Sequence, residues 1–103
     1  MTALRKSITV VVVLLATGTL NSSVVVPRDV FREAAIGGAT AIVIFHNHPS
    51  GDPTPSPEDF IVTRRLVEAG ALMEIEVVDH VILGDARYCS LMGALTQLSL
   101  IHI

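Results

Sequence analysis

Residues 41–59 read A-I-V-I-F-H-N-H-P-S-G-D-P-T-P-S-P-E-D, and this stretch decides the fold. The apolar run at 41–45 is typical of a central strand. The loop at 47–55 contains too many prolines for regular structure. Ser56 can then cap a helix, and Pro57 suits its first position, with an acid three residues after the cap. The stretch therefore predicts a strand, a polar loop and a helix start in direct succession.

The residues before this stretch predict a further strand and helix. The run I-T-V-V-V-V-L-L-A at 8–16 favours a buried strand, because β-branched residues prefer extended structure. With Arg5 and Lys6 before it, the run also resembles the start of a signal peptide, although it is too short to span a bilayer. Segment 27–36 predicts an amphipathic helix that Gly37 and Gly38 end. We expect its buried side to consist of Val30, Phe31, Ala34 and Ala35.

The residues after the stretch complete a layered domain. We expect the helix that begins at Ser56 to run to about residue 69 and to end at Gly70. Strands are predicted at 75–83 and 88–91, separated by a turn at Gly84-Asp85. This order of elements is typical of an α/β (α+β) domain.

Composition limits the class of protein. The 103 residues make one small domain or part of one, and 50% of them are hydrophobic, so a core can form. A net charge of -3 argues against binding nucleic acid through bulk electrostatics. The single cysteine, Cys89, excludes an internal disulfide and fits a reducing compartment. We therefore expect a cytoplasmic bacterial protein with neither direct nucleic-acid binding nor a membrane span.

The end of the chain departs from this pattern. The tail L-S-L-I-H-I at 98–103 has no turn and no amphipathic order, and it matches the in-frame translation of a common transposase sequencing adaptor. We interpret residues 1–97 as a single domain, truncated at both ends, and residues 98–103 as an adaptor artefact. A genuine last strand is the alternative. His102 is therefore not used as a metal ligand.

Two histidines at the end of the predicted strand indicate a metal site. His46 and His48 are two residues apart, so both imidazoles lie on one face. Asp59, in the first turn of the next helix, is the natural third ligand. Two imidazoles and one carboxylate that leave a fourth position open for water are typical of catalytic zinc.

Ser56 has two possible roles beside this site. Its oxygen can cap the helix while its hydroxyl donates to the oxyanion of a tetrahedral intermediate. Considered alone, the capping role is the better explanation of this serine.

The spacing H-x-H-x7-S-x2-D at 46–59 resembles the JAMM motif of the JAB/MPN metalloprotease superfamily. The residues that fill the motif are most similar to those of the RadC-like branch. The resemblance continues through G-T-L-N-S-S at 18–23, P-R-D-V-F at 27–31 and V-V-D-H-V-I-L-G at 77–84, so it covers roughly residues 5 to 92.

The resemblance implies a three-layer, cytidine-deaminase-like fold, in which helices flank a curved mixed sheet. It also implies one Zn²⁺ per chain and hydrolysis of a peptide or isopeptide bond in a protein or peptide substrate. His46, His48 and Asp59 match the metal ligands, and Ser56 matches the serine that assists the oxyanion. Full-length relatives also carry a helix-hairpin-helix region that this sequence does not contain, so the historical DNA-repair label is not transferred.

The resemblance also calls for a glutamate as general base, five residues before the glycine of G-T-L-N-S-S. Val13 occupies that position, and no acid lies between Met1 and Gly18. Either the chain is an inactive relative, or its first residues are mistranslated or truncated, or another acid substitutes. Two hypotheses follow: a zinc metallohydrolase of the RadC type, or an inactive JAB module that binds metal or a partner protein. A cupin-like or H-x-H oxygenase site would need more strands and another histidine.

The remaining polar and sulfur-containing residues have structural interpretations. Asp79 and His80 are adjacent on a predicted strand, so they point to opposite faces. One of them can hydrogen-bond to a metal-ligating histidine. We expect Cys89, Met73 and Met92 to be apolar core residues.

Overall fold

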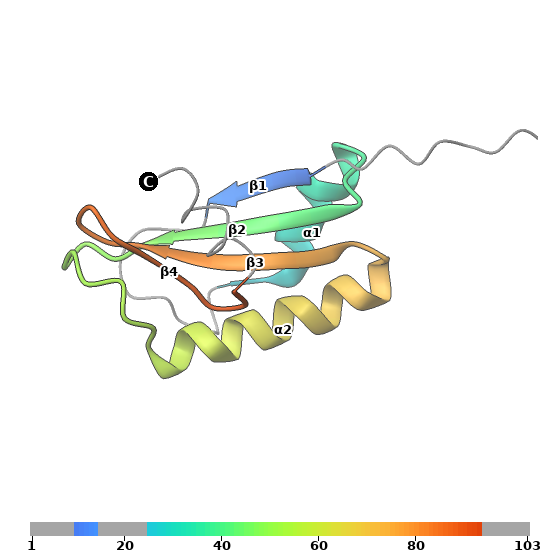
Figure 1. Cartoon of the computed structure of the whole chain (residues 1–103). Coiled ribbons are helices and arrows are strands. Elements are labelled where there is room, and N and C mark those ends of the chain that lie inside the picture. The colour runs from blue at the N-terminus through green and yellow to red at the C-terminus, as the bar shows by residue number, and fades with distance from the viewer. Residues whose placement is uncertain (1–9, 15–24, 94–103) are drawn as a thin grey trace, which may run out of the picture.

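The computed structural model describes residues 10–14 and 25–93 and arranges their elements as one sheet with two helices (Figure 1). In chain order the elements are β1 (Val10–Leu14), α1 (Pro27–Ile36), β2 (Ala41–Asn47), α2 (Pro57–Met73), β3 (Glu76–Leu83) and β4 (Tyr88–Ser90). The strand order is β1-β2-β3-β4. Strands β1 to β3 are parallel and β4 is antiparallel to β3, so the expected mixed sheet is confirmed. The predicted loop at 18–23 and the tail at 98–103 lie outside the described residues.

Helix α1 follows the sequence prediction at both ends. Pro27 occupies its first turn, where a missing N–H has no consequence. After Gly37, the chain turns through Gly38 with a φ of 70°, which favours glycine. The buried side chains of α1 are Val30, Phe31 and Ala34. Ala35 is exposed, so the predicted buried side was one residue too wide.

Helix α2 is longer than predicted, because Gly70 does not end it. The helix continues to Met73 and ends at Glu74, whose φ is 58°. A Cβ at position 70 would collide with the carbonyl oxygen of Ile75 and lie 3.1 Å from the Phe31 ring. Position 70 is therefore a point where the helix packs closely against its neighbours, and this packing explains the glycine.

One hydrophobic cluster joins both helices to the sheet. It contains Phe31 and Ala34 of α1, Val62 and Leu66 of α2, and Ile42 and Ile44 of β2. Because both helices share it, α1 and α2 cover the same face of the sheet. Ala41, Val43 and Val81 on the opposite face are also buried. The expected three layers need cover on that second face, and neither described helix provides it.

A bulge in β3 determines which side chains face α2. Val77 pairs with Ile42, but Asp79 pairs with the next residue, Val43, so Val78 is an extra residue. Simple alternation from the core residue Val77 would place Asp79 on the core face. After the bulge, His80 is paired with Ile44 and faces the core instead.

The sulfur-containing residues are less buried than predicted. Met73 is 48% exposed and Met92 is 43% exposed. Cys89 is half-buried in β4. Met73 lies at the end of α2 and Met92 follows β4, so both lie at the margin of the described core. The predicted core position of these residues is therefore wrong.

Candidate metal centre

The end of β2 brings His46 and His48 to one face of the sheet. His46 is fully buried and pairs with Ile82 of β3. The backbone N–H of His48 donates to Leu83 O at 2.8 Å, which continues the strand pairing beyond the last residue of β2. The two rings lie edge to face, with their centroids 4.8 Å apart. The spacing of two residues therefore places both imidazoles at one point, as the sequence indicated.

Asp59 reaches this point from the first turn of α2. Its backbone N–H donates to Ser56 Oγ at 3.3 Å, and its carboxylate accepts from the Ser56 N–H at 2.7 Å, so the two residues form a capping box. The carboxylate is completely buried. Because the cap holds it at the helix terminus, its orientation is set by local sequence as well as by packing.

Ser56 uses its hydroxyl to hold the carboxylate. Its Oγ donates to Asp59 Oδ2 at 3.0 Å. The predicted capping role is therefore present, and the proton that we assigned to an oxyanion points to Asp59 in this geometry. The oxyanion role remains a prediction.

Distances within the cluster allow the three residues to hold one metal ion. His46 Nδ1 lies 3.3 Å from Asp59 Oδ1, and His48 Nε2 lies 3.4 Å from Asp59 Oδ2. One ligand atom from each residue lies within 4.8 Å of the others. Two atoms that are each about 2.0–2.1 Å from a tetrahedral zinc are roughly 3.3–3.4 Å apart. Charge-assisted hydrogen bonds are shorter, at about 2.7–2.9 Å. The two separations are therefore close to those of metal ligands and longer than those of charge-assisted hydrogen bonds, and each histidine approaches a different Asp59 oxygen.

The hydrogen bonding of Asp59 and His48 supports the same interpretation. Asp59 Oδ1 is buried and accepts no hydrogen bond within the described part of the chain. A buried carboxylate oxygen in this state is a candidate metal ligand. His48 Nδ1 lies 2.9 Å from Asp52 O, and since a carbonyl can only accept, Nδ1 carries the proton. The lone pair of His48 is then on Nε2, which faces Asp59. This is the tautomer that a metal ligand requires.

A second buried histidine, His80, is linked to Asp59 through the hydroxyl of Thr63. His80 Nδ1 lies 2.6 Å from Thr63 Oγ1, and Thr63 Oγ1 donates to Asp59 O at 2.7 Å. Because the Thr63 hydroxyl has one proton, it must accept from His80 Nδ1–H. The His80 ring centroid is 6.1 Å from that of His46. Burial lowers the pKa of His80 to about 4, although the charge of Asp59 opposes this, so the ring is neutral at pH 7.

His80 is thus the residue of the Asp79–His80 pair that lies beside the site. Asp79 lies on the other face, where its carboxylate accepts from the N–H groups of His80 and Met92 and from the hydroxyl of Ser90. Its described contacts bind β3 to β4 and to the residues after β4. The sequence prediction did not include Thr63, although its position four residues after Asp59 places it on the same side of α2.

The expected base position lies beside this cluster in the sheet. Val13 of β1 pairs with Ile44, two residues before His46. The ligand group found among the described residues contains His46, His48 and Asp59, and its one carboxylate is that of Asp59. Substitution of the expected glutamate by another acid stays a hypothesis.

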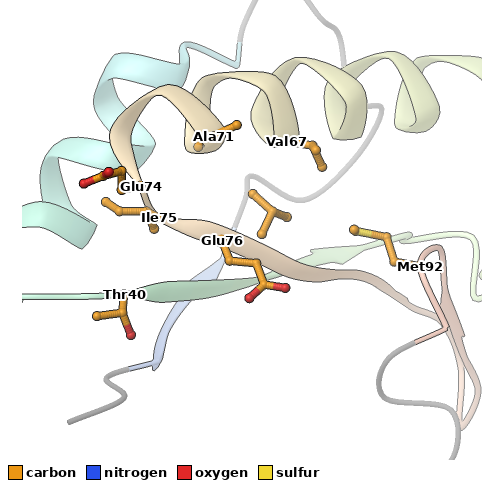
Figure 2. A pocket seen from close by; sticks show the side chains of 9 residues that line it. Thr40, Val67, Ala71, Glu74, Ile75, Glu76 and Met92 are labelled. Atoms are coloured by element: carbon orange, nitrogen blue, oxygen red, sulfur yellow. The ribbon is translucent and has the colours of Figure 1, made fainter. Parts of the chain in front are cut away.

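A pocket of about 420 Å³ lies elsewhere, between the C-terminal half of α2 and the start of β3 (Figure 2). Val67, Ala71 and Met92 form much of its apolar lining, and Glu74 and Glu76 also line it. A rise of about 1.5 Å per residue places Ala71 roughly 18 Å along α2 from Asp59. The pocket is therefore separate from the metal cluster. Within the described ranges, neither helix is long and apolar enough to cross a membrane.

Comparisons with known proteins identify relatives of the chain. A family model described as "RadC-like JAB domain" matches residues 5–97. A "UPF0758 protein" of Moorella thermoacetica is 61% identical over 74 residues, which cover 72% of this chain and 32% of that protein. Proteins with the same name from Syntrophomonas wolfei and Methanosarcina acetivorans are 58% and 53% identical over 74 residues, again 72% of this chain and 32% of theirs. The chain thus spans about a third of the length of these curated relatives.

Proposed function

Because the chain belongs to the RadC-like JAB domain family, we propose that it is a zinc metallohydrolase domain that cleaves peptide or isopeptide bonds at a reduced rate. The observation that carries this proposal is the convergence of His46 Nδ1 and His48 Nε2 on the buried carboxylate of Asp59. Two imidazoles and one carboxylate form a catalytic rather than a structural zinc set, since a fourth position remains open. A zinc ion held there would supply a Lewis acid and an activated water.

The protein's own residues would orient this set. The Asp52 carbonyl fixes the His48 tautomer, and the Ser56 hydroxyl and N–H hold the Asp59 carboxylate. Thr63 binds the Asp59 backbone from within α2. If a metal were bound by the Asp59 oxygens, the Ser56 hydroxyl, 3.0 Å from Asp59 Oδ2, could turn to a substrate oxygen. We propose this as its catalytic role.

Because valine replaces the expected general base at position 13, we expect a low rate of hydrolysis. A positioned general base typically contributes on the order of a hundred- to ten-thousand-fold to the rate. Position 13 pairs with Ile44, two residues before His46 along β2, so a glutamate there would belong to the strand next to the cluster. Valine offers no proton acceptor at this position.

A second candidate is a JAB module that binds zinc or a partner protein without hydrolysis. The same observation at Val13 favours it, together with the absence of a second carboxylate from the described ligand group. The two candidates differ in one measurable property: only the first predicts slow, metal-dependent cleavage by the wild-type chain.

Hydrolysis of fluorogenic peptides and of an isopeptide-linked lysine peptide tests the proposal in wild type and Val13→Glu. We expect slow cleavage by the zinc-loaded wild type and an increase of about a hundredfold or more in Val13→Glu. Val13→Gln is the matched control, because it has similar size and no carboxylate, and it should not increase the rate. A wild-type rate that equals the uncatalysed rate would favour the second candidate. A wild type as active as Val13→Glu would show that no base is missing.

A further inference from the structure

The loop that carries His48 is docked on the turn between β3 and β4. Asp85 N–H donates to Gly51 O at 2.7 Å, and Arg87 Nη2 donates to the same oxygen at 3.3 Å. The turn itself is closed by Gly84 N–H, which donates to Arg87 O at 2.8 Å. One carbonyl of the metal loop is therefore held by two donors from a segment more than thirty residues later in the chain.

Gly84 permits this contact because it has no side chain. A Cβ at position 84 would lie 2.5 Å from Gly51 O and 2.7 Å from Pro53 Cδ, closer than real Cβ contacts. The backbone of Gly84 does not have a positive φ, so an alanine there would meet no conformational strain of its own. Contact with the loop is the structural reason for a glycine at position 84.

The docked segment surrounds the residue that sets the tautomer of His48. Gly51 and Pro53, the two residues that approach the turn, flank Asp52. The carbonyl of Asp52 accepts from His48 Nδ1 at 2.9 Å and leaves the lone pair on Nε2. A displacement of Gly51 and Pro53 would therefore move the acceptor that holds His48 in its ligand form.

From these contacts we propose that Gly84 and Arg87 are positioning residues for the metal ligand His48. They fix the tautomer and direction of its imidazole through Gly51 and Asp52. The inference rests on the proposed metal binding for its consequence, and on the contacts of Gly51 and Asp52 for its geometry. Neither residue belongs to the ligand group.

The test compares Gly84→Ala and Arg87→Gln with wild type in two measurements. In metal-free protein, ¹⁵N NMR of the His48 ring should show Nδ1–H in wild type and a mixture of tautomers in Gly84→Ala. In zinc titrations the affinity should fall about ten- to a hundredfold in Gly84→Ala and about two- to fivefold in Arg87→Gln. Gly38→Ala is the matched control, because its φ of 70° makes alanine strained there while no atom lies near its Cβ. It should lower stability and leave both measurements unchanged.

The outcomes separate this inference from the proposed function. If wild type binds no zinc, the proposed function fails, while the His48 tautomer in the metal-free variants still decides the inference. If Gly84→Ala does not fold, Arg87→Gln provides the same comparison on a milder scale. The same tautomer and zinc affinity as wild type in the folded variants would overturn the positioning role.

Discussion

Acidification should destabilise the metal-free protein through His80. Burial lowers the pKa of this histidine from 6.5 to about 4 in the folded chain, and the nearby Asp59 carboxylate only partly offsets that effect. Above pH 6.5 the ring is neutral in both folded and unfolded states, so it does not affect stability. Between about pH 6.5 and 4 the unfolded chain binds a proton that the folded chain excludes, and the free energy of unfolding falls as the pH falls.

The size of the effect follows from the two pKa values. Each pH unit within this window lowers the free energy of unfolding by about 1.4 kcal/mol, and the whole window corresponds to about 3 kcal/mol. Small domains have about 5–15 kcal/mol in total, so this one proton would remove a large fraction of the stability. Below the folded pKa both states are protonated and the loss levels off.

Urea unfolding in the presence of a chelator, from about pH 7 to about pH 4.5, measures this dependence in wild type and His80→Gln. Glutamine does not titrate, and its amide can still donate to Thr63 Oγ1. The other titrating groups are the same in both proteins, so they contribute equally to the two pH slopes. We expect the wild-type slope to exceed that of the variant by about 1.4 kcal/mol per pH unit. Equal slopes, or an NMR titration of the His80 ring with a midpoint near its ordinary value, would refute the reasoning.

Two further predictions concern the stability of α2. Ser56→Ala removes the cap of this helix and should cost about 1 kcal/mol in urea unfolding, whereas Ser56→Thr, which retains a hydroxyl, should cost much less; equal losses would contradict the capping role. Leu66→Ala opens a cavity in the core and should cost about 3 kcal/mol, while Leu72→Ala on the same helix, 89% exposed, should change stability by less than about 0.5 kcal/mol. Similar losses at Leu66 and Leu72 would contradict the packing described for α2.

Local signals in the sequence predicted the elements that build the site. Ser56 and Pro57 predict the start of α2, and the structure contains both the cap and the proline at its first turn. The spacing of His46 and His48 predicts a shared face, and the structure places their rings together. These features depend on a few neighbouring residues, so they can be inferred without knowledge of the tertiary structure.

The features that the sequence did not predict depend on tertiary contacts. Gly70 has the appearance of a helix end, but its close contacts with Phe31 and Ile75 place it inside α2. The bulge at Val78 decides that His80 rather than Asp79 faces the site, and strand alternation alone gives no sign of it. Likewise, the contact of Gly84 with the metal loop joins segments far apart in the chain.

Zinc content per chain tests the central claim, the metal site of His46, His48 and Asp59, most directly. Elemental analysis measures the zinc content of three proteins: wild type, His46→Ala and the control Glu68→Gln. Glu68 lies on the exposed side of α2 and outside the cluster, so its substitution removes a carboxylate that is not a ligand. We expect about one Zn²⁺ per chain in wild type and in Glu68→Gln, and almost none in His46→Ala. No zinc in wild type, or the same zinc content in His46→Ala, would contradict the account.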